Sequence, residues 1–340
     1  FGLPAARRAV RDHLASRGTE APVERVVLTA STSEAYGFLF ELLCDPGDEV
    51  LVGLPGYPLL DHLAQLHDVR LAPFRLRYDG RWHIDFHTLE SALSHRTRAI
   101  VLVHPNNPTG SFVSRADLER IESLAAERGL AIVSDEVFFD YAYCAAGGGL
   151  GSPSATPSRD SPDSPARSVA TVRNALSFVL GGLSKSAALP QMKLGWIVLA
   201  GPERLVDEAL ARLEVIADAA LSVGAPVQHA LPVLLRRAAQ TRWRALQRVL
   251  DNRARATALV AGTATTLLHA EGGWYAVLRV PTTKTDEAWA LELLREDGVL
   301  VQPGYLFDFE ADGHLVVSLL CRRAVLAEGM SRLVARIERG

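Results

Sequence analysis

Four short polar segments in this sequence each follow an apolar, strand-like run, and their residue types could perform chemistry together. Residues 29–35 are rich in small hydroxyl side chains, and residues 105–110 place two asparagines in a tight turn. Residues 134–138 hold a carboxylate, and residues 181–186 hold a lysine. Ligands of open α/β sheets bind outside the carboxyl ends of the strands, where segments that are distant in the chain converge. We therefore expect the four segments to form one site.

The chemistry of each segment follows from its side chains. Ser31, Thr32 and Ser33 precede a helical pattern, and free amides at a helix N-terminus bind phosphate, although such residues are also common helix caps. A carboxylate at a buried strand end needs a partner, which for Asp135 could be the nitrogen of a cationic heterocycle. Lys185 lies in a turn of small residues, where desolvation would free its amine for Schiff-base chemistry.

Apolar runs that alternate with helical patterns must position these segments. The strand-like runs cover residues 26–28, 49–52, 99–103, 130–133, 177–180 and 196–199. Near-continuous apolar strands with helices between them are typical of a mainly parallel sheet covered on both faces. The sequence thus predicts an α/β fold.

The pattern changes after residue 226 to longer helices and shorter strands. Strand-like runs cover residues 274–280, 299–301 and 314–320, and helical patterns cover 286–295 and 324–337. We expect a large domain over residues 1–235 and a smaller α+β domain over residues 236–340. Residues 236–255 carry seven arginines, but their interleaved apolar residues favour an amphipathic helix with a solvated face over a nucleic-acid contact.

Composition narrows the class of partner. The 340 residues are 48% apolar and 22% charged, with a net charge of −3, which is typical of a globular chain and gives no field for nucleic acid or an anionic membrane. No apolar run approaches the length of a membrane span. Three widely spaced cysteines predict neither a disulfide framework nor a metal site. We expect a cytoplasmic protein that binds small molecules.

Two further features of the sequence concern an insertion and the start of the chain. Residues 145–168 are rich in Gly, Ser and Pro, which predicts a mobile surface insertion within the large domain. The sequence starts at Phe1 rather than Met, and a helical pattern begins at once over residues 3–15. We therefore expect that a segment precedes Phe1 in the natural protein.

The strings Asn-Pro-Thr-Gly, Asp-Glu-Val and Ser-Lys, in this order and with compatible spacing, resemble the class I and II aminotransferases that use pyridoxal 5′-phosphate on the fold-type I architecture. The resemblance covers essentially the whole chain. It implies a mainly parallel, seven-stranded type of sheet in the large domain, a homodimer, and transfer of an amino group between an amino acid or amine and a 2-oxo acid. Lys185 would hold the cofactor as a Schiff base and move the proton, and Asp135 would pair with its ring nitrogen.

The same resemblance implies supporting residues around the cofactor. Asn107 matches the asparagine that bonds the phenolic oxygen, and Tyr57 matches the aromatic residue that stacks on the ring. The residues that would bind the phosphate come from separate turns: Ser31, Thr32, Ser33, Ser184 and Lys193.

Four positions depart from the family pattern, and one of them is Gly182, where a serine commonly binds the phosphate. Phe138 stands where a tyrosine often bonds the phenolic oxygen, and Lys193 stands where an arginine usually binds the phosphate. Val316 stands where an arginine grips the substrate carboxylate. Arg322 lies six residues on, about 20 Å along an extended strand, which is too far for a local slip. Either another residue, such as Arg279 or one ahead of the first residue, binds the carboxylate, or the substrate is not an ordinary α-amino acid.

Two alternatives keep the same cofactor and stay open at this point. A lyase or decarboxylase on the same fold would share these motifs, because the outcome depends on which substrate bond is aligned. The chain could also be the sensor domain of a transcription regulator that responds to pyridoxal phosphate, with a DNA-binding domain ahead of Phe1.

Overall fold

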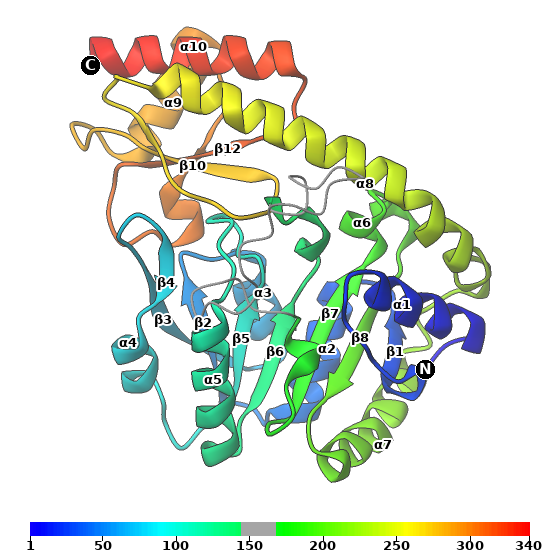
Figure 1. Cartoon of the computed structure of the whole chain (residues 1–340). Helices are drawn as coiled ribbons and strands as arrows, with labels where there is room; N and C mark the ends of the chain where they lie inside the picture. The colour runs from blue at the N-terminus through cyan, green and yellow to red at the C-terminus, as the bar shows by residue number, and fades with distance from the viewer. Residues whose placement is uncertain (144–167) are drawn as a thin grey trace.

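A computed structural model describes residues 1–143 and 168–340 of the chain (Figure 1). Its larger part is built on one sheet with the strand order β1-β8-β7-β6-β5-β2-β3-β4. The strands are β1 (Val26–Thr29), β2 (Glu49–Leu54), β3 (Arg70–Tyr78), β4 (Trp82–Ile84), β5 (Thr97–Val103), β6 (Ala131–Asp135), β7 (Ser177–Gly182) and β8 (Gly195–Ala200). All but the last residue of the expected insertion at 145–168 lies outside the described residues.

The sheet is parallel at its centre and antiparallel at its edges. β3, β2, β5, β6 and β7 run parallel, whereas β8 pairs antiparallel with both β7 and β1. The connection from β7 to β8 holds only the short helices α6 (Leu183–Ser186) and η5 (Pro190–Met192), so the chain turns straight back. The expected α/β fold is confirmed, with the short β4 added as an eighth strand.

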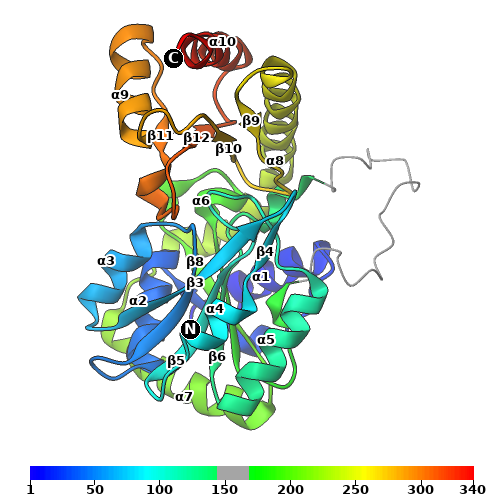
Figure 2. The same cartoon turned by 90° about the vertical axis from the view of Figure 1, so that its left-hand side faces the viewer.

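Helices cover both faces of this sheet, as Figure 2 shows. The helices α2 (Thr32–Leu43), α3 (Leu59–Leu66) and α7 (Glu203–Ala220) bury apolar side chains against one face. On the other face lie α1 (Pro4–Ser16), α4 (Phe86–Ser91), α5 (Arg115–Arg128) and the start of α8 (Ala225–Val260). Burying both faces explains why the central strands read as apolar runs.

Local signals set the ends of several helices, and α5 is the clearest case. The Ser114 hydroxyl accepts a hydrogen bond from the Asp117 amide at 3.0 Å, which caps the first turn. Gly129 ends the helix with φ at 65°, the left-handed conformation that glycine adopts without strain.

The smaller part of the molecule is an antiparallel sheet with two helices. The sheet has the order β11-β12-β10-β9 and comprises β9 (Thr266–Leu267), β10 (Tyr275–Arg279), β11 (Gln302–Pro303) and β12 (His314–Ser318). Its helices are α9 (Asp286–Asp297) and α10 (Arg323–Arg339). The helix α8 runs along both parts of the molecule (Figure 1), so the domain boundary expected at residues 235 and 236 falls inside one continuous helix and stays a prediction.

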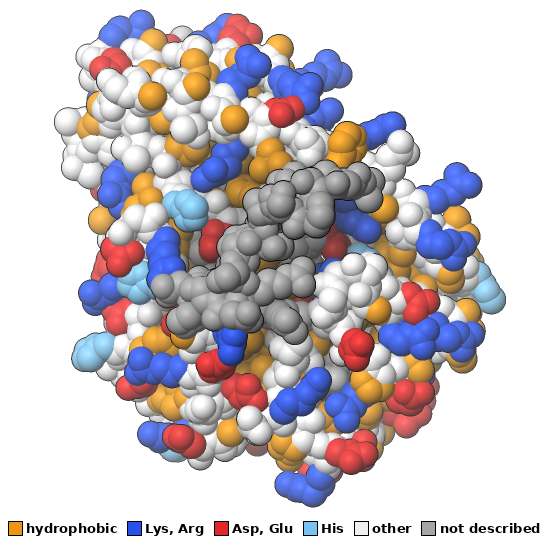
Figure 3. Space-filling view, in the orientation of Figure 1, with side chains coloured by type: hydrophobic (Ala, Val, Ile, Leu, Met, Phe, Trp, Pro, Cys, Tyr) orange, Lys and Arg blue, Asp and Glu red, His pale blue; other side chains and the backbone are white. Residues whose placement is uncertain are grey.

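Several surface features bear on the expected partners. Within residues 1–143 and 168–340, no helix is long and apolar enough to cross a membrane. On the face seen in Figure 3, acidic and basic side chains are interspersed. The arginine-rich stretch forms part of α8, and its Leu246 and Val249 are buried, which confirms the amphipathic interpretation. Cys44 and Cys321 are free thiols.

Candidate active site

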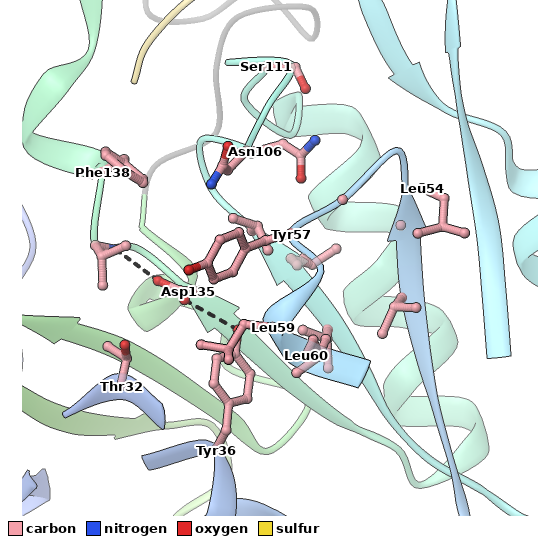
Figure 4. Close-up of a pocket in the computed structure, with 18 of the residues that line it drawn as sticks. Thr32, Tyr36, Leu54, Tyr57, Leu59, Leu60, Asn106, Ser111, Asp135 and Phe138 are labelled. Carbon is pink, nitrogen blue, oxygen red and sulfur yellow. Dashed lines mark hydrogen bonds between the residues drawn. The ribbon is translucent and has the colours of Figure 1, made fainter. Parts of the chain in front are cut away.

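A cavity of about 500 Å³ opens at the carboxyl ends of the central strands. Residues from all four polar segments line it, as expected from the way parallel strand ends meet. The nine residues singled out in the sequence all reach it: Ser31, Thr32, Ser33, Tyr57, Asn107, Asp135, Ser184, Lys185 and Lys193. Figure 4 shows how Tyr57, Asn106 and Asp135 converge from separate elements.

Asp135, the last residue of β6, is held by two hydrogen bonds. Its carboxylate accepts from the Val137 amide at 3.1 Å and from the Tyr36 hydroxyl at 3.4 Å (Figure 4). Burial raises the pKa of Asp135 to about 6, against the opposing effects of these two hydrogen bonds and of the Lys185 charge. A cationic partner in the cavity would therefore lower the pKa of Asp135 and stabilise its carboxylate.

Tyr36 is a site residue that the sequence analysis missed. It lies on the second turn of α2, is buried, and points its hydroxyl at Asp135 (Figure 4). Burial and the Asp135 carboxylate raise the pKa of the Tyr36 phenol well above its usual value, so it acts as a hydrogen-bond donor. Tyr36 follows Thr32 by four residues, so both lie on the same face of α2. Because Thr32 belongs to the turn expected to bind phosphate, that spacing was the signal that the sequence offered for Tyr36.

Lys185 lies on α6, directly after β7, and its amine lies near two aromatic rings. Its Nζ lies 5.6 Å from the ring centroid of Phe138 and 5.5 Å from that of Trp274. Burial lowers the pKa of Lys185, although the Asp135 carboxylate opposes this effect. A lowered pKa increases the share of neutral amine, which is the nucleophilic form.

Tyr141 supports the lysine from behind instead of lining the cavity. Its hydroxyl donates to the backbone carbonyl of Lys185 at 2.9 Å, and its side chain is fully buried. Its ring contacts that of Trp274 edge to face, with 4.9 Å between the centroids. Because the hydroxyl is engaged there, Tyr141 does not offer the phenol that is absent at Phe138.

The turn before α2 has the structure of an anion seat. Ser31 is the N-cap, and its hydroxyl accepts from the Glu34 amide at 3.1 Å. The first amides of a helix have no partner within the helix, so those of this turn are available to an anion. Thr29 pairs with Gly195 in the β1–β8 ladder, which brings the loop of Lys193 next to the seat.

The two asparagines of the 105–110 turn have different surroundings. Asn106 donates from its amide nitrogen to the Pro55 carbonyl at 3.0 Å and to the Thr109 hydroxyl at 2.9 Å, which fixes the loop that carries Tyr57. Asn107 is buried and lines the cavity, and its Oδ1 has no hydrogen-bond partner within the described chain. An unpartnered buried amide facing a cavity is suited to a ligand.

The position of the expected carboxylate-binding arginine is apolar. Val316 lies on β12 with 1% of its surface exposed, in a cluster with Trp82, Val277 and Phe307. Arg279 does not take its place, because this side chain stacks over Tyr78 at 5.4 Å from the ring centroid and is not among the residues that line the cavity.

A buried ionic cluster lies behind β6. Arg17 Nη2 lies 3.1 Å from Glu136 Oε2, with 13% and 0% of the two side chains exposed. Glu136 also accepts from the Ser168 hydroxyl at 2.9 Å and the Val169 amide at 2.8 Å. The cluster therefore ties the end of α1 to the residue next to Asp135 and to the segment before β7.

Replacing Arg17 by methionine is expected to lower the free energy of unfolding by about 3 kcal/mol, because it leaves the Glu136 charge buried without compensation. Urea denaturation would measure the change. Arg212→Met, at an exposed position of α7, is the control and should change stability by less than about 0.5 kcal/mol. Equal effects of the two substitutions would contradict a stabilising role for the Arg17–Glu136 pair.

An α/β fold with a lysine, a carboxylate and an anion-binding turn at its strand ends is typical of a protein that binds a small molecule there. The model of one family, the class I and II aminotransferases, matches residues 1–333. The chain belongs to this family, whose members transfer amino groups and generally depend on pyridoxal phosphate. The expected class of enzyme is thereby confirmed.

Similar proteins agree with this assignment. Glutamate-pyruvate aminotransferase of Haemophilus influenzae is 27% identical over 98% of this chain and 80% of its own. Nicotianamine aminotransferase 1 of rice is 29% identical over 74% of this chain, and the match spans 47% of that longer protein. The structure of an alanine aminotransferase from Pyrococcus furiosus superposes with a TM-score of 0.84 at 24% identity, covering 100% of this chain and 83% of that one.

Proposed function

We propose that the chain binds pyridoxal 5′-phosphate in this cavity and transfers an amino group between an amino compound and an oxo compound there. The convergence of Lys185, Asp135 and the Ser31 turn in one cavity carries the proposal. The residues present fit the cofactor. The lysine amine has a lowered pKa, the Asn107 Oδ1 is buried without a partner, and the helix start offers free amides to a phosphate.

When bound, the cofactor supplies an aldehyde that takes up the amino group and a conjugated ring that withdraws electrons from the reacting carbon. Lys185 would hold the cofactor through its Nζ and, once released, carry a proton to and from the reacting carbon. Asp135 would keep a proton on the ring nitrogen, and Asn107 would bond the phenolic oxygen. Tyr57 would cover one face of the ring.

The phosphate would lie against the start of α2. Ser31, Thr32 and Ser33 would donate from backbone and hydroxyl groups, with Ser184 beside them. Lys193 would add a point charge where a guanidinium would form a two-pronged contact, so the phosphate is held with less directionality. The relatives named above favour amino-group transfer over the lyase and sensor alternatives.

Reductive labelling tests the proposal directly. The chain holds three lysines, Lys185, Lys193 and Lys284, so each site of attachment gives a distinct peptide. Borohydride treatment of the protein with its cofactor should place the label on the peptide that contains Lys185, and addition of an amino donor beforehand should prevent labelling. Labelling at Lys193 or Lys284, or no effect of any donor, would overturn the proposed function.

Tyr36→Phe is expected to lower kcat by about 10-fold, because it removes one hydrogen bond to a carboxylate, a contact of about 1.5 to 3 kcal/mol. The same change removes an interaction that lowers the pKa of Asp135, so the acid limb of the pH–rate profile should move upward. Tyr143→Phe, whose hydroxyl bonds the Gly273 carbonyl at 3.3 Å, is the matched control. An unmoved pH profile in Tyr36→Phe would mean that Tyr36 is only structural.

We also propose that the protein is a homodimer, the assembly that the family resemblance implies. Large apolar side chains such as Leu66 on α3 and Trp243 on α8 are exposed in the single chain, and exposed apolar surface is typical of an interface. Sedimentation analysis would test this, and a monomer at micromolar concentration would contradict it. A cytoplasmic location stays a prediction.

A further inference from the structure

The charged side chains that line the cavity offer no free cation to a carboxylate on the substrate. The basic residues that line it are Lys185, Lys193 and His83, and the acidic residues are Asp61, Asp117, Asp135 and Asp308. Across the described part of the chain, no arginine reaches the cavity. A carboxylate needs a cationic or hydrogen-bonding partner when it leaves water.

Each of the three basic residues already has another partner or role. Lys185 lies between two aromatic rings beside Asp135, and the proposed function uses it to hold the cofactor. The Lys193 loop lies next to the Ser31 turn, where it would face the phosphate. His83 Nδ1 lies 3.5 Å from the Asp79 carboxylate.

The arginines on strands next to the cavity contact other groups. Arg75 and Arg77, both on β3, lie 3.9 Å from Glu310 and 2.5 Å from Asp85. Arg279 at the end of β10 stacks over a tyrosine ring. Freeing any of these for a substrate would break the contact that it makes now.

An apolar cluster backs the cavity on the side of β12, and only one of its members lines the cavity itself. We define the β12 wall as Trp82, Val277, Phe307 and Val316, which form one buried cluster. Trp82 lines the cavity, and the other three pack behind it. An anion placed against Trp82 would lose hydration and find no compensating charge in the wall, whereas a methyl group or an aromatic ring would gain contact.

Two carboxylates at the mouth of the cavity would repel an anionic substrate. Asp61 on α3 and Asp308, which follows the short helix η6 (Gly304–Phe307), both line the cavity. Burial and the neighbouring Asp61 carboxylate raise the pKa of Asp308, and this rise outweighs the opposing effect of the Arg75 charge. Two neighbouring carboxylates disfavour an entering anion and favour an entering ammonium ion.

Resting on the proposed function, we infer that the preferred amino donor is a primary amine with an apolar or aromatic body and no carboxylate on the carbon that carries nitrogen. The C–N bond of this amine would be exchanged for a C=O bond with water as the source of oxygen. The amino group would stay with the cofactor until an oxo compound takes it. The donor carbon is oxidised and the acceptor carbon is reduced, so no outside oxidant is needed.

Matched donors that differ by one carboxylate test this inference. The holoenzyme is mixed with phenethylamine or phenylalanine, and with 3-methylbutylamine or leucine, without an acceptor, and the absorbance of the bound cofactor is followed. We expect kcat/KM for each amine to exceed that of its amino acid by about 10-fold or more, since an unpaired carboxylate is costly to bury. An amino acid that reacts as fast as its amine would overturn the inference and leave the proposed function standing.

A charge placed in the β12 wall gives an independent measurement. Val316→Arg should shift the amine to amino acid ratio toward the amino acid by about 10-fold or more, because it supplies a guanidinium. Val316→Leu keeps the wall apolar and should leave the ratio unchanged. If Val316→Arg folds and the ratio does not move, the lack of a cation on this side of the cavity does not set the donor class and the inference fails.

A third outcome distinguishes failure of the inferred donor class from failure of the proposed function. If no donor of either kind changes the absorbance of a protein that holds the cofactor on Lys185, the proposed amino-group transfer itself fails. If both amino acids react and the amines do not, transfer stands and a cation outside the described lining binds the carboxylate. Only faster reaction of the amines supports the donor class inferred here.

Discussion

Lys185→Ala is expected to reduce the rate of the donor half-reaction on the order of 10⁴-fold, the upper range for loss of a positioned proton-transfer group. Two functions disappear together, because the same Nζ would attach the cofactor and carry the proton. The lowered pKa of Lys185, caused mainly by burial, makes this amine suited to both. Stopped-flow absorbance after mixing with excess donor would measure the loss.

A matched lysine makes this result specific. Lys284 lies in the smaller part, where it pairs with Glu292 at 2.5 Å, so Lys284→Gln should keep the wild-type rate. Adding methylamine to Lys185→Ala should restore part of the activity, since a free amine can carry the proton that the side chain no longer carries. A Lys185→Ala protein that keeps a tenth of the wild-type rate would remove Lys185 from the proposed mechanism.

Asp135→Asn is expected to lower the rate on the order of 10² to 10³-fold, as found when a single preorganised electrostatic contact is removed. The asparagine can still accept from the Val137 amide, so the local backbone should persist. It cannot hold a positive charge on a ring nitrogen. Binding of the cofactor and the half-reaction rate should therefore both be measured, and an unchanged rate would contradict the role proposed for Asp135.

The same substitution should stabilise the cofactor-free protein at neutral pH. A native carboxyl group whose pKa is raised from 3.8 to about 6 binds a proton that the unfolded chain has released. The free energy of unfolding therefore falls as the pH rises from about 4 to about 6 and is level above that range. At pH 7 the Asp135→Asn protein should be more stable by about 3 kcal/mol.

Urea denaturation of the cofactor-free proteins between pH 4 and pH 7 would test this expectation. The two proteins should have similar stability at the acid end of the range and diverge as the pH rises. A constant difference across the range would mean that Asp135 does not titrate near pH 6 in the native state. In that case the Asp135 carboxylate would not lower the free energy of unfolding at neutral pH.

Much of the fold could be predicted from the chain because its signals are local. The six apolar runs became strands, and local caps at Ser114 and Gly129 set the two ends of α5. The strands β3 and β4 at one side of the sheet were missed, because β3 contains Pro73 and has only one buried residue among exposed and partly buried ones instead of forming an apolar run. The strand expected at 299–301 is displaced to Gln302–Pro303.

The residues of the site also fall into two groups, those that local patterns predict and those that only packing brings together. Lys185, Asp135 and Asn107 follow strand ends in recognisable strings, so their approach to one cavity could be predicted. The contact of Tyr36 with Asp135 joins residues that are 99 positions apart. The spacing from Thr32 places Tyr36 on the right face of α2, but the contact itself depends on how α2 packs against the strand that ends at Asp135.

The sequence by itself determined the family, the α/β fold and the residue types gathered at the strand ends, because these depend on short-range patterns of burial and on spacing along the chain. Only the tertiary structure decided which charges face the cavity. It turned Arg279 toward a tyrosine ring, bonded Tyr141 to the Lys185 carbonyl and buried Val316 in an apolar wall. Charge complementarity depends on which side chains meet across distant segments, and packing alone settles that.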